Sequence, residues 1–84
     1  MLITSIDYSN YIGKIAIGKV SRGELKEGDR ISLVDRQDNV RKSQIKELFV
    51  YEGLKRVKVS SVKSGEICAI LGIEKFDIGD TVSD

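Results

Sequence analysis

The segment that most constrains the fold spans residues 13–31 and has the sequence GKIAIGKVSRGELKEGDRI. Two apolar runs, at residues 15–17 and 31–34, flank a stretch that contains Gly23 and Gly28. Because glycine adopts positive backbone φ without steric cost, two glycines five residues apart indicate two reversals of chain direction. The segment therefore predicts a strand, a turn, a short extended piece, a second turn and another strand.

Runs rich in β-branched and aromatic residues predict further strands along the chain. We expect strands over residues 2–8, 12–20, 31–34, 56–62, 67–71 and 81–82, with a hairpin loop over residues 35–39. The apolar phase slips between Ile17 and Val20, which predicts a β-bulge at Gly18. In the connector over residues 73–79, Phe76 and Ile78 are expected to plug the core.

Residues 41–48 leave helix and strand open. Ile45, Leu48 and Phe49 recur at helical spacing, whereas residues 49–51 form a β-rich triplet that Gly53 soon follows. Propensity alone does not decide between the two structures at this segment.

The number and spacing of the expected strands indicate an all-β fold. Eighty-four residues allow a single domain with one modest core. Six or seven short strands with turns every 8–12 residues or so are typical of a small β-barrel or sandwich. A closed antiparallel barrel would remove the unpaired strand edges on which a short, Val/Ile-rich domain would otherwise aggregate.

Composition narrows the function classes. The single cysteine, Cys68, lies in the apolar run 67–71, so we expect it in the core and without a disulfide partner. The first ten residues lack the pattern of a signal peptide, and no apolar run approaches the length of a membrane helix. We therefore expect a soluble protein of a reducing compartment, without a membrane partner.

A match to the phosphate-binding loop G-x-x-x-x-G-K-[ST] at residues 13–20 is rejected on physical grounds. Val20 has no hydroxyl for Mg²⁺, the intervening residues favour a strand, and no amphipathic helix follows. The chain has no histidine, and its aspartates sit in or beside predicted turns, where they bond local backbone. We expect no catalytic, metal-binding or cofactor-binding residues, and no enzyme in this chain alone.

Basic residues concentrate in the middle of a nearly neutral chain. The net charge is +1, but residues 41–63 carry seven basic and two acidic side chains. The residues that flank the 35–39 loop and the Gly53 turn are Arg36, Arg41, Lys42, Lys46, Lys55, Arg56 and Lys58, with Phe49 and Tyr51 nearby. Contact with an RNA backbone and an ordinary solvated face both explain this pattern.

Four stretches resemble those of a known family. The spacing G-x-I-x-x-G-x-V-x-x-G-x-L-K-x-G-D, which begins at Gly13, resembles the second, elongation-factor-Tu-like barrel domain of translation GTPases. The stretches IKELFVYEGL (residues 45–54), KRVKV (residues 55–59) and SGEICAILGIEKFDIGDT (residues 64–81) are similar to one subgroup, BipA, also called TypA. This resemblance favours a long strand with a bulge over residues 41–48 rather than a helix.

The resemblance implies a non-catalytic domain of a larger cytoplasmic protein. Residues 1–84 would be an excised second domain that packs against a GTPase domain and contacts small-subunit rRNA. The parent would be a monomeric, ribosome-stimulated GTPase with roles in stress response and ribosome assembly, and GTP and Mg²⁺ would bind in its missing domain. A passive scaffold that orients neighbouring domains without touching RNA is the alternative, and no DNA partner is expected.

The same resemblance gives candidate residues. The rRNA contacts are expected among the basic residues of the opening motif and the basic segment: Lys14, Lys19, Arg22, Arg41, Lys42 and Arg56. Turn geometry is assigned to Gly23, Gly28 and Asp29, and the bulge to Gly18.

Overall fold

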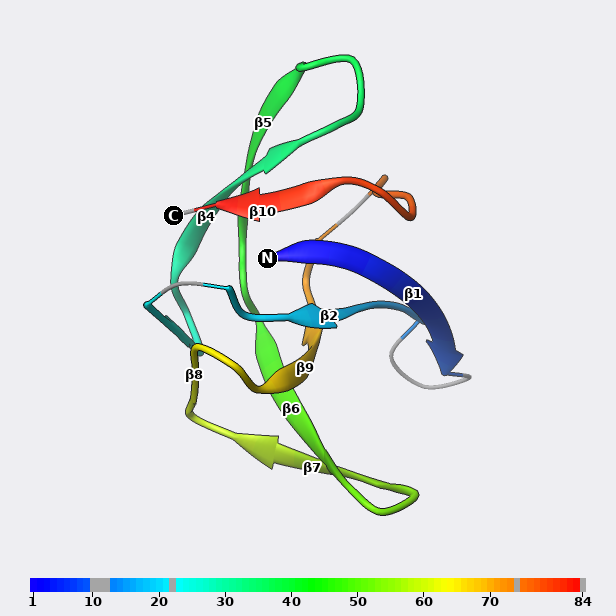
Figure 1. Ribbon diagram of the computed structural model, residues 1–84, viewed down its shortest axis with the longest axis vertical. Helices are drawn as coiled ribbons and strands as arrows, with labels where there is room; N and C mark the ends of the chain where they lie inside the picture. The colour runs from blue at the N-terminus through cyan, green and yellow to red at the C-terminus, as the bar shows by residue number, and fades with distance from the viewer. Residues whose placement is uncertain (10–12, 22, 74, 84) are drawn as a thin grey trace.

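A computed structural model describes residues 1–9, 13–21, 23–73 and 75–83 of the chain. These residues contain strands and no helix (Figure 1). The strands are β1 (Leu2–Ser9), β2 (Gly13–Lys19), β3 (Glu24–Lys26), β4 (Arg30–Val34), β5 (Val40–Gln44), β6 (Glu47–Glu52), β7 (Lys55–Val59), β8 (Ser61–Lys63), β9 (Ile67–Leu71) and β10 (Thr81–Ser83). The expected all-β class is confirmed, although ten strands form rather than six or seven.

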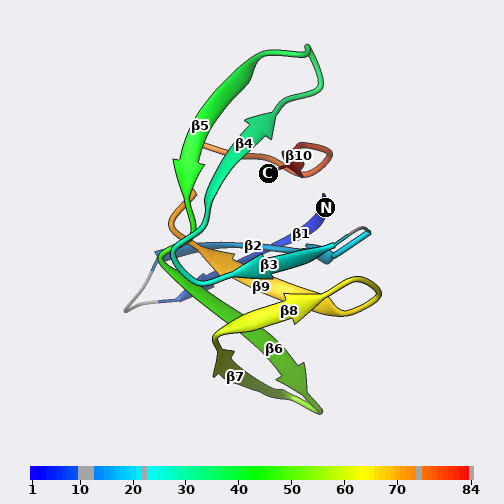
Figure 2. The same ribbon diagram turned by 90° about the vertical axis from the view of Figure 1, so that its left-hand side faces the viewer.

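Eight strands form one antiparallel sheet in the order β5-β4-β10-β1-β2-β9-β6-β7. The remaining two, β3 and β8, pair with each other as a small separate sheet (Figure 2). Strand β10 therefore lies between β4 and β1, which brings the last described residues beside the first ones (Figure 1).

The large sheet is not closed into a barrel, so that part of the prediction is wrong. Strands β5 and β7 are its two ends, and no pairing among the described strands joins them. Each of these end strands pairs on one side only, β5 with β4 and β7 with β6, so their other sides have no partner strand among the described residues. Strands β5 and β6 follow each other in the chain, but β5 pairs with β4 and β6 pairs with β9.

The joint between β5 and β6 replaces the bulge expected within one long strand. Ile45 is fully buried, and its backbone N–H donates to the carbonyl of Asp29 at 2.9 Å. The N–H of Lys46 instead donates to the carbonyl of Leu71 at 2.8 Å. The chain thus changes its pairing partner from β4 to β9 at residues 45 and 46. The segment is extended, so the prediction of a strand rather than a helix is confirmed.

The main core lies on one face of the large sheet. Its largest fully buried side chains include Ile3, Ile31, Leu33, Leu48 and Ile70, which come from four different strands. Along β9 the side chains alternate between the two faces of the sheet. Cys68 and Ile70 face this core, whereas Ala69 and Leu71 face the other side. The expected burial of Cys68 is confirmed.

Burial makes the Cys68 thiol unreactive, which gives a first prediction. Loss of hydration raises the pKa of the Cys68 thiol to about 11. Because the thiolate is the nucleophile, we expect native protein at pH 8 to react with a maleimide at least about 100-fold more slowly than unfolded protein. Rapid stoichiometric labelling without denaturant would contradict this burial.

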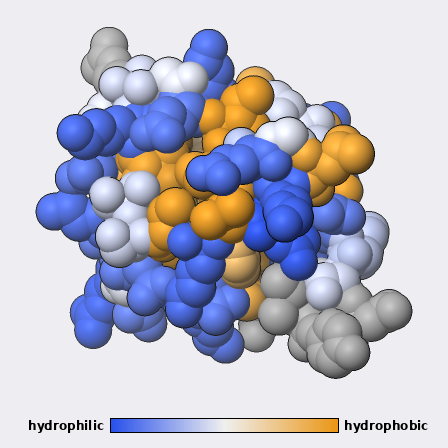
Figure 3. Space-filling model, turned by 90° about the horizontal axis from the view of Figure 1, so that it is seen from below, coloured by the Kyte–Doolittle hydropathy of each residue, from blue (hydrophilic) through white to orange (hydrophobic). Residues whose placement is uncertain are grey.

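A second, smaller apolar cluster lies on the opposite face of the same sheet. It consists of Ile15, Phe49 and Ala69, with Ile17, Tyr51 and Leu71 packed against it. On the face seen from below, where β6 and β7 lie in Figure 1, apolar side chains show in the centre among hydrophilic ones (Figure 3). Parts of β2, β6 and β9 are therefore apolar on both faces, as the sequence of β9 predicted.

Gly18 lies within β2, and it is not the bulged residue. The register shifts on the opposing strand, between Ile3 and Ser5 of β1, so Thr4 is the extra residue. Gly18 instead provides space, since a Cβ there would lie 2.2 Å from the carbonyl oxygen of Leu2. The slip in apolar pattern was a correct signal of a bulge, but it pointed to the wrong strand.

The connector before β10 buries only one of its two expected plugs. Phe76 is 3% exposed and joins the main core, whereas Ile78 is 50% exposed. Ile78 lies in a turn in which the side chain of Asp77 accepts a hydrogen bond from the Ile78 N–H at 2.8 Å. That turn fixes the backbone and leaves the isoleucine side chain outside.

The turns of the opening segment have the expected glycine geometry. Gly23 and Gly28 have φ of 67° and 89°, values that favour glycine. At the second turn, the Asp29 carboxylate accepts a hydrogen bond from the N–H of Lys26 at 3.0 Å. This contact is the local backbone bonding that aspartate provides in turns.

Candidate nucleic-acid interface

The two lysines of β2 lie at opposite ends of the strand. The half-buried Lys14 donates from Nζ to the carbonyl of Phe76, and its ammonium lies 4.4 Å from the centroid of the Phe76 ring. Lys19 is exposed at the other end of the strand. Lys14 is therefore engaged in holding the connector, whereas Lys19 is available to solvent.

Arg41 and Lys42 point to opposite faces of β5. Arg41 is paired across the ladder with the buried Leu33, and its guanidinium donates to the carbonyl of Lys75. Lys42 is paired with Ser32, and its Nζ donates to the hydroxyl of that serine at 3.0 Å. Both side chains remain exposed, so each has further donors for an anionic ligand.

Arg56 of β7 covers the second apolar cluster. Its guanidinium lies 5.2 Å from the centroid of the Phe49 ring and 3.6 Å from a carboxylate oxygen of Asp7. The nearby Tyr51 has its pKa raised by burial and by the charge of Asp7. Arg56 thus links β7 to β1 across a cluster that would otherwise be more exposed.

This position predicts a stability role for Arg56. Replacing Arg56 by alanine is expected to lower the free energy of unfolding by about 1 kcal/mol, because one partly exposed ion pair and one cation–π contact are lost. Urea denaturation measures the change, and Lys55→Ala at the neighbouring exposed position is the matched control. Equal stabilities of the two variants would contradict the role.

The five expected contact residues that the structure describes do not form one continuous surface. Arg22 lies outside the described residues. Lys14 and Arg56 are engaged in the fold, and Lys19 lies on β2, which is separated from β5 by β1, β10 and β4. Arg41 and Lys42 therefore remain as the pair around which an interface can be built.

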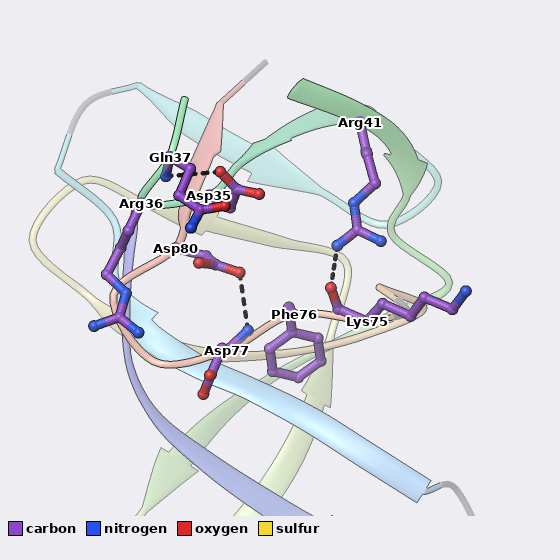
Figure 4. A pocket seen from close by; sticks show the side chains of 8 residues that line it. All are labelled: Asp35, Arg36, Gln37, Arg41, Lys75, Phe76, Asp77 and Asp80. Carbon is purple, nitrogen blue, oxygen red and sulfur yellow. Dashed lines mark hydrogen bonds between the residues drawn. The ribbon is translucent and has the colours of Figure 1, made fainter. Parts of the chain in front are cut away.

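A cleft lies between the β4–β5 loop and the connector before β10 (Figure 4). It has a volume of about 480 Å³, and a neighbouring hollow of about 290 Å³ shares Arg41 and Lys75 with it. Together they are lined by four cationic side chains, of Arg36, Arg41, Lys42 and Lys75, and by three carboxylates, of Asp35, Asp77 and Asp80. We call these two connected spaces the cationic cleft.

The carboxylates of the cationic cleft are bound to nearby backbone. Asp35 accepts from the N–H groups of Gln37 and Asn39 at 2.8 and 2.9 Å, and Asp80 accepts from the N–H of Asp77 at 2.9 Å. Figure 4 shows the hydrogen bonds of Gln37 to Asp35 and of Asp77 to Asp80. These hydrogen bonds hold the two carboxylates in their own turns, but they do not remove the negative charge that the aspartates bring to the cleft.

The Asp35 turn predicts a pH dependence of stability. The N–H of Asn39, assisted by that of Gln37, holds the pKa of Asp35 below its ordinary 3.8. A carboxyl with a lowered folded-state pKa stabilises the fold above its unfolded pKa, and this stabilisation is lost as pH falls through the folded value. We expect Asp35→Asn to weaken the fall in stability below pH 4, as measured by thermal melts from pH 2 to 7. An unchanged acid profile would contradict this.

Lys75 is the member of the cleft that sequence reasoning missed. It is one of two described non-glycine residues with positive φ, at 55°, and its carbonyl faces Arg41. The acidic composition of residues 64–84 hid it, because Lys75 is the single basic residue there. Only the pairing of β5 with the rest of the sheet shows that this connector lies beside the basic segment.

The structure also excludes the nucleotide-binding interpretation of residues 13–20. Residues 13–19 form β2, which pairs with β1 and β9, so their backbone N–H groups do not form a phosphate-binding loop. Among the described residues, no group of three His, Cys, Asp or Glu side chains could hold a metal ion. The described part of the chain also contains no helix long and apolar enough to cross a membrane.

The described strands form an antiparallel β domain that carries a charged cleft on its surface. The chain belongs to the elongation factor Tu domain 2 family, whose model matches residues 13–83. Its similarity to BipA and TypA proteins extends along the whole chain.

Three relatives illustrate this similarity. The putative elongation factor TypA-like SVR3, chloroplastic, of Arabidopsis thaliana is 42% identical over 100% of this chain. The large ribosomal subunit assembly factor BipA is 37% identical over 98% of the chain in Buchnera aphidicola subsp. Schizaphis graminum and 35% identical over 95% in Bacillus subtilis. The chain spans only 12%, 14% and 13% of these three relatives, respectively.

Proposed function

We propose that this chain is the second domain of a longer BipA/TypA-like translation GTPase and that it contacts ribosomal RNA through the cationic cleft. The observation that carries the proposal is that Arg36, Arg41 and Lys75, from two separate segments, line one hollow (Figure 4). The ribosome is the proposed partner because relatives are named large ribosomal subunit assembly factors.

The chemistry of such a contact is electrostatic. Each cation that neutralises a phosphate releases a condensed counterion, so affinity falls as salt rises. Arg36 and Arg41 can offer two donors each to phosphate oxygens, whereas Lys42 and Lys75 act as point charges. Such contacts position a protein on RNA without reading its sequence.

The other properties of the longer protein are part of the same proposal. GTP and Mg²⁺ would bind in a separate GTPase domain, and residues 1–84 would hold neither. The longer protein would act in the cytoplasm, as a monomer, in ribosome assembly and stress response. Small-subunit rRNA is the contact that we propose from family resemblance, although the relatives' names refer to the large subunit.

A passive scaffold remains the second candidate function, and a specific observation favours it. Lys14 and Arg56 are already engaged within the fold, and Lys58 forms ion pairs with Glu27 and Glu47, both at 3.5 Å. Much of the basic composition therefore supports the structure. Only the cationic cleft distinguishes an RNA-contacting domain from a spacer.

Crosslinking of the longer protein to purified ribosomal subunits separates the two functions. Ultraviolet crosslinks should join rRNA to peptides that contain residues 35–42 or Lys75, and the subunit that crosslinks identifies the partner. Crosslinks confined to other domains, with this domain free, would favour the scaffold. A control variant with Lys55→Glu and Lys63→Glu, two exposed lysines outside the cationic cleft, should crosslink as the wild type does.

A further inference from the structure

A notch opens at the place where β6 and β9 separate. The ladder that joins these strands ends at the pair of Val50 and Cys68. Beyond that pair, β6 continues to the β6–β7 turn, whereas β9 begins at the turn that follows β8 (Figure 2). The space between the two strands has a volume of about 530 Å³ and shares no lining residue with the cationic cleft. We call it the β6–β9 notch, and its lining residues are Val50, Tyr51, Glu52, Gly65, Glu66 and Ile67.

The floor of the notch is apolar. Tyr51 and Ile67 would form the next pair if the ladder continued, so their side chains lie on the face of the second apolar cluster. Tyr51 packs against that cluster, but Ile67 is 57% exposed. Ile67 therefore extends the apolar surface of the cluster into the notch, where it is open to solvent.

The rim of the notch is acidic. Glu52 and Glu66 are the charged residues that line it. One oxygen of Glu66 accepts a hydrogen bond from the N–H of Lys63 at 3.0 Å, which orients the carboxylate. Lys19 and Lys55 are ladder partners of notch residues, but in the described part of the chain no ion pair joins either lysine to the two glutamates. The ion pairs of the described residues use other carboxylates, those of Asp7, Glu24, Glu27 and Glu47.

Backbone groups of both strands also face the notch. A two-residue turn joins β6 to β7, so the residues that flank this turn form a hydrogen-bonded pair. Bonded and non-bonded pairs alternate along a ladder, so the N–H and C=O of Tyr51 point away from β7 and toward the notch. On β9, the carbonyl of Glu66 accepts from the N–H of Val20 at 3.0 Å, so the groups of the next residue, Ile67, point the other way, into the notch. Because the ladder has ended, the carbonyls of Tyr51 and Ile67 need hydrogen-bond partners from outside the sheet.

We infer that the β6–β9 notch is a docking site for a basic segment of a partner protein, with an arginine side chain that enters between the two strands. The stem of the arginine would lie on Tyr51 and Ile67, as long cationic side chains do on apolar surface. Its guanidinium has five donors and no acceptor, which matches two carboxylates and two carbonyl oxygens. RNA lacks this match, because its phosphates would meet the acidic rim. The inference concerns a second surface and does not depend on rRNA contact at the cationic cleft.

Fluorescence anisotropy with a short labelled peptide of alternating arginine and valine tests the inference on the chain of residues 1–84. We expect saturable binding, and we expect Glu52→Lys with Glu66→Lys to weaken it at least about tenfold, because attraction becomes repulsion. The matched control is Glu24→Lys with Glu27→Lys, the same change of charge at two exposed glutamates outside the notch. Equal weakening by the two double variants would be an effect of net charge and would overturn the inference.

The peptide supplies further controls that leave the protein unchanged. Replacing its valines by glycines should weaken binding at least about threefold, because contacts with the apolar floor are lost. Replacing its arginines by glutamates should abolish binding. A glutamate peptide that bound as tightly as the arginine peptide would overturn the inference, whether or not the protein variants fold.

Nuclear magnetic resonance locates the site on the chain. The peptide of arginine and valine should shift the amide signals of Tyr51 and Ile67 and leave those of Arg41 and Lys75 unchanged. Shifts confined to other residues would overturn the inference. An oligouridine that shifted the signals of Tyr51 and Ile67 would assign the notch to RNA and overturn it too. A dimer of the chain in sedimentation that Glu52→Lys with Glu66→Lys dissociates would assign the notch to a second copy, which would equally contradict the proposed partner.

Discussion

Replacing Gly18 by alanine is expected to lower the free energy of unfolding by about 3 kcal/mol, a large part of the stability of a domain of this size. The added Cβ would lie 2.2 Å from the carbonyl oxygen of Leu2 and 3.1 Å from two side-chain atoms of Met1. The nearest of these atoms belongs to the backbone of a paired strand, so the clash is relieved only if β1 moves away from β2. The measurement is urea denaturation of the purified domain.

The control for Gly18 is a glycine with open space around it. Gly65 has φ of 91°, and a Cβ there would meet nothing within 4 Å, so Gly65→Ala adds only backbone strain. We expect that variant to lose about 1 kcal/mol. If Gly18→Ala were no more destabilising than Gly65→Ala, the close approach of β1 to β2 at the bulge would be wrong.

Reversing both charges at Arg41 and Lys42 is expected to weaken ribosome binding by the longer protein at least about tenfold near 0.1 M salt. Two phosphate contacts would be lost, so the slope of log K against log salt should become shallower by roughly one unit for each contact. Arg41 contacts the carbonyl of Lys75 and Lys42 contacts the hydroxyl of Ser32, and both side chains are exposed, so we expect the domain to remain folded. Circular dichroism of the variant checks this.

The matched control carries the same change of charge elsewhere. Lys55→Glu with Lys63→Glu alters two exposed lysines on β7 and β8, outside the cationic cleft. We expect this pair to leave the salt slope nearly unchanged. If both double variants weakened binding equally, net charge rather than the cleft would explain the effect.

Local features of the fold followed from the sequence, because they depend on neighbouring residues. Glycine conformation determined the turns at Gly23 and Gly28, and alternation predicted β9 as a strand with two apolar faces. The apolar character of Phe76 and Cys68 was enough to place them in the core. In each of these cases the preference of a short segment agrees with the final structure.

Features that depend on distant contacts could not be predicted in this way. The break between Ile45 and Lys46 arises because their N–H groups bond to two different segments of the chain. Lys14 looked like a free cation until the structure placed Phe76 beneath its ammonium. Lys75 joined the candidate site only because the connector crosses next to Arg41.

A salt titration of ribosome binding tests the proposed function most directly. The longer protein is compared with a version that lacks residues 1–84, and the affinity is measured at several salt concentrations. We predict that deletion lowers the affinity and makes the slope of log K against log salt shallower, because the domain itself neutralises phosphates. An unchanged slope would contradict the proposal and show that the domain acts as a spacer.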